Sequence, residues 1–181
     1  MSRWAKRAAI TAAVVALLAT AGFAYHRHVY PFGWSHCCDK QLMFALLDYA
    51  ERHGGWFPKG EATPEASLSL LYRDDPFRVD ANLLRGKTVP ELAVRARLEA
   101  GELLTPATCG WHYVEGLRKG DDQRLALFWD KVGLGHNGER LPDGGHWVCF
   151  VSLSIEYVPE SQWEAFLSEQ ERLRAALKQA R

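Results

Sequence analysis

The sequence has no excess of charge of either sign, because 22 Lys and Arg balance 22 Asp and Glu among its 181 residues. A chain without a strongly basic field is not expected to bind nucleic acid in general. Its four cysteines are too few for a disulfide-dense miniprotein. It also has no internal repeat and no low-complexity run. With 48% hydrophobic and 24% charged residues, it is expected to form one packed domain, or one domain with an appendage.

Charge is also missing from a long stretch near the N-terminus. Arg3, Lys6 and Arg7 come first without any acidic residue, and residues 8–25 then carry no charge at all. A helix over those 18 residues spans roughly 27 Å, close to the thickness of the hydrocarbon core of a bilayer. A charged cluster that begins at His26 comes next.

Three interpretations of this segment stay open. It is a single-pass anchor that binds the membrane through residues 8–25, a signal peptide cleaved after the small residues Ala19 and Ala21, or a buried helix of a soluble fold. Under the first two interpretations the rest of the chain is exported. We therefore divide the chain into residues 1–30, a membrane anchor or signal peptide, and residues 31–181, an extracytoplasmic (periplasmic) domain at the inner membrane.

Apolar residues at helical spacing, with start and stop signals, predict further helices. The predicted ranges are residues 35–53, 65–72, 90–100 and 162–179. Gly54 and Gly55 are expected to end the first of these in a left-handed turn. Capping-box patterns at Thr88 and Ser161 mark the starts of the last two. Residues 74–87 are expected to form a loop.

The second half of the chain has the composition of strands. Residues 109–114, 124–131 and 147–158 are rich in aromatic and β-branched side chains. Between them, residues 133–145 hold five glycines and a proline and predict a long loop. Helices first, then a small antiparallel sheet and a C-terminal helix, predict the α+β class.

Three stretches of the chain share a further arrangement. A Leu-rich helix over residues 38–50 is followed by Gly54-Gly55 and then Phe57-Pro58, Cys109 leads a strand-like segment, and residues 129–158 hold strand-like runs around a Gly-rich loop. Over about residues 37–170 this arrangement resembles bacterial type IV pilin-like proteins of the major-pseudopilin type, which serve type II secretion. The resemblance implies a non-enzymatic structural or interaction protein of the cell envelope, with partners in a secretion or pilus-like assembly.

The chain departs from that family's pattern. The family's processing motif places Gly, Phe and Glu before the apolar run, but the first Glu here is Glu51, so the anchor is expected to stay unprocessed. At the predicted hairpin tip, Leu153 stands in a Ser-Leu-Ser sequence where the family has Asp-Gly-His. Because Leu adopts a positive φ less readily than Gly, a different turn or an uninterrupted strand is expected. Asp143 alone does not supply a calcium loop.

The cysteines are candidates for disulfides, since an exported compartment favours them. The candidates are Cys37, Cys38, Cys109 and Cys149. The vicinal pair Cys37–Cys38 is a poor one, which leaves two pairings, each joining the first helix of the domain to the sheet. Buried free thiols are the alternative. Spacing of the C-x-x-C or C-x-x-H kind is absent, so no zinc site is expected.

A catalytic site is not evident, and neither cofactor nor metal is expected. A hydrolase would need His136 or His146 to converge with Asp130 or Asp143. Cys/His dyads of Cys109 with His112, or Cys149 with His146, are not favoured, because positions three apart on a strand point to opposite faces.

Aromatic residues suggest an alternative function, an exported binding module for glycan or peptide. Six tryptophans are candidates either for its surface or for the core, namely Trp34, Trp56, Trp111, Trp129, Trp147 and Trp163. The core interpretation is the favoured one.

Overall fold

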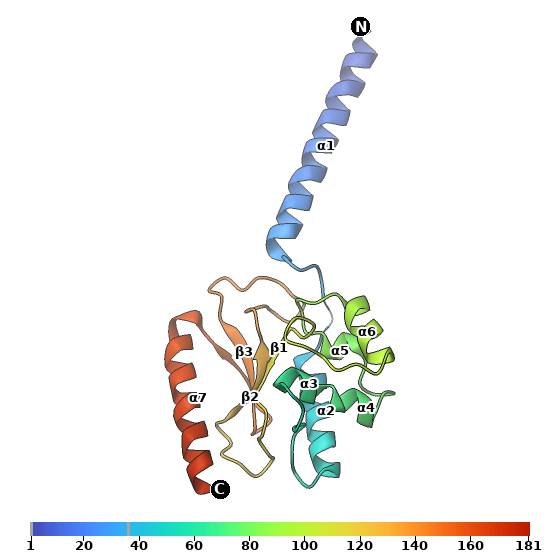
Figure 1. Cartoon of the computed structure of the whole chain (residues 1–181). Coiled ribbons are helices and arrows are strands. Elements are labelled where there is room, and N and C mark those ends of the chain that lie inside the picture. Colours follow the sequence, from blue (N-terminus) through green and yellow to red (C-terminus); the bar gives the residue numbers. More distant parts are fainter. Residues whose placement is uncertain (1, 36) are drawn as a thin grey trace.

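The computed structural model describes residues 2–35 and 37–181, so Met1 of the predicted anchor and His36 of the first predicted helix of the domain lie outside the described residues. Helix α1 (Arg3–Val29) projects alone from the rest of the chain, which we call the head (Figure 1). At about 1.5 Å per residue it is roughly 40 Å long. No residue of α1 is buried, and its most apolar window has a mean hydropathy of 1.9. It is long and apolar enough to span a membrane, and it is not the buried helix of a soluble fold.

The head has the predicted α+β class and order. Its first part is helical, with α2 (Asp39–Arg52), α3 (Pro64–Leu68), α4 (Leu70–Asp74), α5 (Ala81–Leu84) and α6 (Glu91–Glu99). A four-stranded antiparallel sheet in the order β1-β2-β3-β4 comes next, and α7 (Glu160–Ala180) ends the chain. The strands are β1 (Trp111–Tyr113), β2 (Ala126–Asp130), β3 (His146–Phe150) and β4 (Ile155–Val158).

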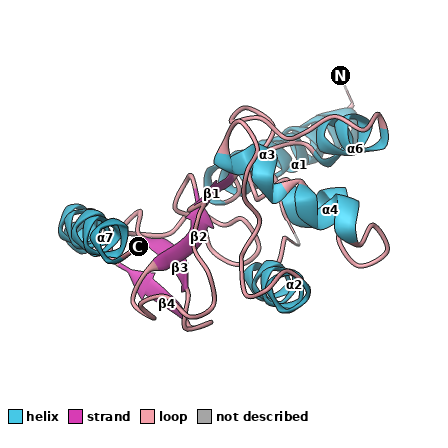
Figure 2. Ribbon diagram, turned by 60° about the horizontal axis from the view of Figure 1, so that its bottom comes forward, coloured by secondary structure: helices cyan, strands magenta, loops and turns pink. Residues whose placement is uncertain are grey.

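The sheet lies between two helical layers. Helix α7 covers one face and the α2–α6 group lies on the other side (Figure 2). Every residue of β2 is buried as a result. The buried amide of Gln170 fixes α7 to β2, since its Oε1 accepts from the Ala126 N–H at 2.8 Å and its Nε2 donates to the Arg124 carbonyl at 3.1 Å.

Several local predictions are wrong. Helix α2 begins at Asp39, residues 65–72 form two helices that meet at Ser69, and the predicted loop 74–87 contains α5. The Asp80 side chain caps α5 by accepting from the Leu83 N–H at 2.8 Å. The two capping boxes are not used, because α6 and α7 begin after Pro90 and Pro159, which are the N-cap residues.

Of the two outcomes expected at the hairpin tip, the uninterrupted strand is wrong. Strands β3 and β4 pair as two separate strands, and Leu153 between them adopts φ +63°, the left-handed conformation judged unfavourable for it. Its N–H donates to the Phe150 carbonyl at 2.9 Å, and its side chain packs against the core. Burial of the leucyl side chain therefore offsets the backbone strain at this turn.

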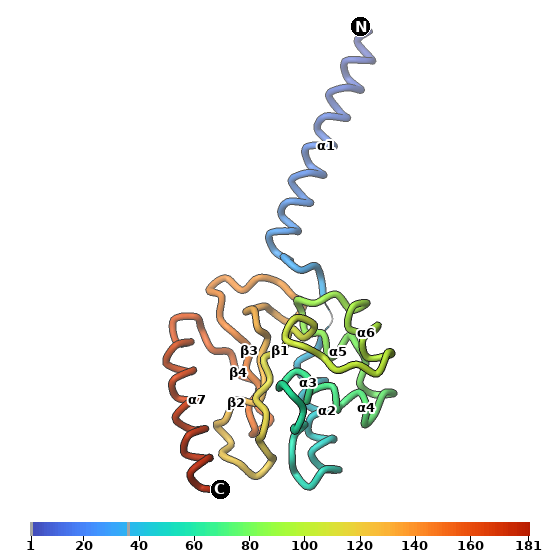
Figure 3. Tube along the Cα trace, in the orientation of Figure 1, coloured from blue at the N-terminus to red at the C-terminus, as the bar shows by residue number. Residues whose placement is uncertain are grey.

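The Gly-rich loop 133–145 is ordered and holds the end of α1. The Arg140 N–H donates to the Val29 carbonyl at 2.7 Å, and the Ser35 N–H donates to the Asn137 carbonyl at 2.9 Å. Gly138, at φ +82°, packs so closely that a Cβ there would lie 3.1 Å from the Gly33 carbonyl oxygen. In Figure 3 the loop, drawn in orange, lies beside the point where α1 enters the head. The helix is thus fixed to the head by backbone contacts.

A close approach of two glycines sets the turn between α5 and α6. Gly86 has φ +67°, and a Cβ there would lie 2.8 Å from the backbone of Gly110, whose N–H donates to the Arg85 carbonyl at 2.8 Å. The Gly110 carbonyl in turn accepts from the Lys131 N–H, directly after β2. These contacts bring Lys87 next to the end of β2.

The two glycine positions Gly86 and Gly54 provide a matched pair for a stability test. Gly54 has φ +63° with open space around its Cβ position, so Gly54→Ala should lower the free energy of unfolding only by the left-handed penalty, about 1–2 kcal/mol. Gly86→Ala adds a clash between the new Cβ and the backbone of Gly110, so it should lower the free energy of unfolding by more than Gly54→Ala does. Urea unfolding of the detergent-solubilised chain, followed by Trp fluorescence, measures both. Equal losses would show that the close approach to Gly110 does not constrain the head.

Candidate functional site

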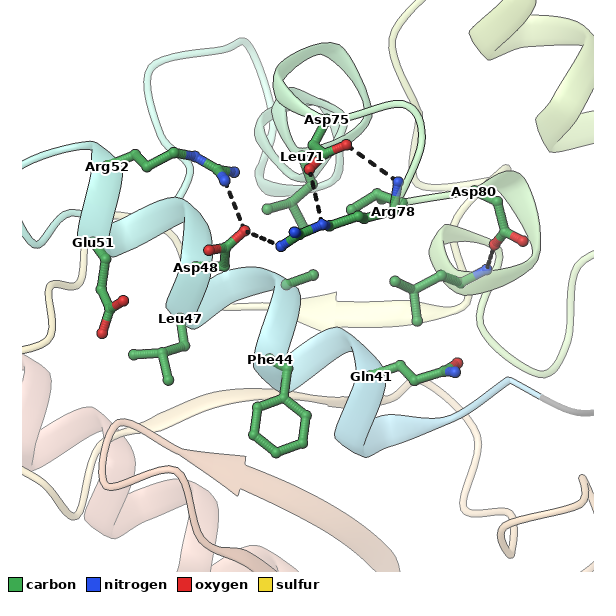
Figure 4. A pocket seen from close by; sticks show the side chains of 13 residues that line it. Gln41, Phe44, Leu47, Asp48, Glu51, Arg52, Leu71, Asp75, Arg78 and Asp80 are labelled. Carbon is green, nitrogen blue, oxygen red and sulfur yellow. Dashed lines mark hydrogen bonds and ion pairs between the residues drawn. The ribbon is translucent and has the colours of Figure 1, made fainter.

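A groove on the head runs between α2 and the segment from α4 to α5 (Figure 4). Its volume is about 460 Å³, within the usual range of ligand pockets. Leu71, Val79 and Leu83 form a buried apolar floor. At the α2 edge the Phe44 ring is 60% exposed. An apolar floor beside an exposed aromatic ring is suited to receive a nonpolar side chain of a partner.

Charged side chains surround this floor. Four acidic residues and two arginines line the groove, namely Asp48, Glu51, Asp75, Asp80, Arg52 and Arg78. Arg52 and Arg78 both reach Asp48, at 2.7 and 3.8 Å (Figure 4). The lining therefore carries a formal net charge of −2, from four acids and two arginines.

The second candidate site is a buried ion cluster at the junction of the helices and the sheet. The Lys87 Nζ, with a fully buried side chain, lies 2.9 Å from Oδ1 of Asp39 at the start of α2 and 2.5 Å from Oδ2 of Asp130 at the end of β2. The Trp111 ring lies 5.6 Å from the Nζ. Within residues 2–35 and 37–181, Asp130 Oδ1 is the buried side-chain atom that lacks a hydrogen-bond partner.

Burial dominates the electrostatics of this cluster. Loss of solvent raises the pKa of Asp130 to about 7, although Lys87 opposes the shift. Burial lowers the pKa of Lys87, but attraction to Asp130 and Asp39 outweighs this and leaves the pKa above its ordinary value. The cluster thus places an ammonium beside a carboxyl group that is partly protonated at neutral pH. It therefore brings together, out of contact with water, the Lys87 amine as a potential nucleophile, the Asp130 carboxyl group as a potential electrophile, and the second carboxylate of Asp39.

The four cysteines are free thiols in the structure, which gives no support to the predicted disulfides. Cys37 donates to the Leu83 carbonyl at 3.3 Å and Cys109 to the Leu84 carbonyl at 3.5 Å. Cys149 is also buried, whereas Cys38 is half-buried. Burial raises the pKa of the Cys109 and Cys149 thiols to about 12. Thiols in that state are protonated and unreactive at neutral pH.

The structure does not assemble the catalytic sets considered for the histidines. His136 is exposed on the Gly-rich loop. The buried His146 ring stacks on Trp163 with centroids 4.0 Å apart, and its Nδ1 lies 3.0 Å from the backbone carbonyl of Asp130, not from a carboxylate. His112 in β1 is exposed, whereas Cys109, which precedes that strand, is buried. Among the described residues, no three His, Cys, Asp or Glu side chains form a metal-binding group.

The tryptophans divide between core and surface. Trp111 and Trp129 are buried in the core, and Trp163 is half-buried against it. Lys59, with its Nζ 3.2 Å from the ring centroid, lies over Trp56. Trp34 and Trp147 are exposed. The aromatic surface required by the glycan-binding alternative is therefore smaller than the tryptophan count suggests.

Sequence reasoning missed both candidate sites. Lys87 lies in a stretch predicted to be a loop, and lysines are almost never fully buried, so nothing local marks it. One wall of the groove is formed by residues beyond Asp74, from Asp75 to Leu83, which the same prediction left without structure. The run of charges around Asp75 and Arg78 was the available signal. No family model, curated protein or solved structure matches the chain.

Replacing the buried ammonium gives a pH-dependent prediction. Lys87→Met leaves Asp39 and Asp130 without their cation, and the chain should lose about 3–5 kcal/mol at pH 8. Without Lys87, the pKa of Asp130 rises above 7, while it stays near 4 in the unfolded chain. The folded variant then binds the extra proton, so its stability falls as the pH rises, and its deficit against wild type grows from pH 5 to pH 8.

Denaturant titrations at both pH values measure this deficit. Lys40→Met, on the exposed neighbour of Asp39 in α2, is the matched control and should have little effect. A Lys87→Met variant as stable as wild type at pH 8 would contradict the description of the cluster.

Proposed function

We propose that this chain is a membrane-anchored, pilin-like interaction protein of the cell envelope, without enzymatic activity, and that its head lies on the periplasmic side of the inner membrane. The observation that carries the proposal is that α1 is apolar and wholly unburied, yet fixed to the head at its C-terminal end by Arg140. An uncovered apolar helix of that length needs a nonpolar environment, which a bilayer supplies. The resemblance to pseudopilins supports the interaction role.

The flanking residues of α1 support a retained anchor in this orientation. Arg3, Lys6 and Arg7 lie at its N-terminal end, which favours a cytoplasmic N-terminus. Exposed aromatic side chains occur at both ends, with Trp4 at one and Tyr25, Phe32 and Trp34 at or just beyond the other. Aromatic residues are enriched at both interfaces of a membrane. A cleaved signal peptide has no need for a second aromatic belt.

The groove is the surface through which the head would bind its partner. Its apolar floor suits a nonpolar side chain, and its net negative lining favours basic neighbours on the same segment. The occupant that fits is therefore a segment of another protein with an apolar anchor flanked by Lys or Arg.

The anchor is tested on the full-length chain in its native cells. The protein should remain in membranes washed with alkaline carbonate, dissolve in detergent, retain residues 2–21 and lose its head to protease added outside spheroplasts. Recovery of the chain from the soluble fraction, or of a chain that begins at Gly22, would contradict a retained anchor.

The groove is tested with a pair of exposed phenylalanines. A photo-crosslinking residue at Gln41, which lines the groove, should capture a partner protein through a segment that combines apolar and basic residues. Phe44→Glu should abolish this product, because it puts a charge at the apolar edge. Phe77→Glu is the control, since Phe77 is 99% exposed and outside the lining. A product that survives Phe44→Glu, or that consists of two copies of this chain, argues against the assigned partner.

A further inference from the structure

The contact between Lys87 and Asp130 is more deeply buried than the other lysine–carboxylate contacts of the head. Lys131 Nζ lies 2.6 Å from Glu65 Oε1, almost the same distance, but the Lys131 side chain is 29% exposed. The Lys87 side chain is fully buried and that of Asp130 is 3% exposed. The two groups are thus held against each other out of contact with water, with Asp39 as a second carboxylate on the same Nζ.

We propose that Lys87 and Asp130 condense to an intramolecular amide, an isopeptide bond between Nζ and Cγ, with Asp39 as the group that moves the proton. The head would then carry a covalent link between the α5–α6 turn and the end of β2. This inference does not depend on the proposed function, and it holds whether or not the groove binds a partner.

The reaction balances without any other reactant. Asp39 takes a proton from the Lys87 ammonium, and the free amine attacks Cγ of the protonated Asp130 carboxyl group. In the tetrahedral intermediate that forms, the nitrogen passes one proton to the leaving hydroxyl, which departs as water, and Asp39 then releases to solvent the proton that it took from Lys87. One C–N bond forms, one C–O bond breaks, and one water molecule leaves. No electrons pass to an acceptor, and Asp39 ends in its starting state.

The surroundings favour the approach of the two groups. A 2.5 Å contact to Oδ2 brings Nζ close to the distance of about 3–3.5 Å from Cγ at which reacting atoms attack. Fixed neighbours of this kind reach effective concentrations of about 10⁵–10⁸ M. Burial raises the pKa of Asp130 to about 7, so that part of the carboxyl group is in its protonated, electrophilic form at neutral pH. Asp130 Oδ1 is unpartnered in the described part of the chain, so no hydrogen bond to that atom stabilises the ionised carboxylate.

Peptide mass spectrometry of the full-length, detergent-solubilised protein after reduction and denaturation tests the proposal. The chain should be lighter than its sequence by one water molecule. Trypsin should release a branched peptide in which residues 86–95, uncut after Lys87, are joined to residues 125–131. Separate peptides 88–95 and 125–131 at full yield would overturn the proposal. So would a water loss confined to Asp143-Gly144, where a succinimide has the same mass.

Variants separate the roles of the three residues. Lys87→Arg keeps the positive charge but cannot form this bond, and its mass should be that of its sequence. Asp39→Asn keeps both reacting groups, so its linked fraction should be reduced and should rise with time of incubation, because Asp39 is a positioning and proton-moving residue. Lys131 and Glu65 give an internal control in the same digest, where no branch is expected. A branch there as well would show that proximity alone, not the dry cluster, causes linkage.

Discussion

A single ammonium group, buried between two carboxylates, connects the parts of this head. Lys87 lies in the turn after α5, Asp39 begins α2 and Asp130 ends β2, so the contacts of the Nζ connect that turn, α2 and the sheet at one point. Removing an ammonium and two carboxyl groups from water is unfavourable unless they satisfy one another, and a displaced helix or strand would leave one of them unpaired. The cluster therefore restricts how the helical layer lies on the sheet. The close contact between Gly86 and Gly110 also restricts this arrangement, because it positions Lys87 beside the end of β2.

Local patterns in the sequence were enough for the class and order of the elements, but not for the contacts that the elements make with one another. The α+β arrangement, the left-handed end of α2 at Gly54 and Gly55, and the C-terminal helix follow from periodicity and from glycine conformation. The ion cluster joins residues 48 and 43 positions apart, and no local signal relates them. At Leu153 a local signal exists but is overridden, because tertiary packing keeps this residue at a positive φ that its own propensity disfavours.

The functional features, like the fold, are only partly visible in local sequence patterns. The apolar run of α1 is visible in the sequence, but only the structure shows that Arg140 and the Gly-rich loop hold its end, so that head and helix form one unit. A head fixed in this way holds its groove at a defined orientation relative to α1. Among the conspicuous residues of the sequence, Trp111 and His146 are buried and serve in packing, whereas Trp34, Trp147 and His136 are exposed.

Hydrogen exchange on the full chain in a lipid nanodisc tests most directly whether the buried cluster unites the head. The account predicts that amides beside Lys87, beside Asp39 and along β2 exchange together and most slowly, at the rate of global unfolding. Faster exchange of α2 and the α5–α6 turn, as a unit separate from the sheet, would contradict it.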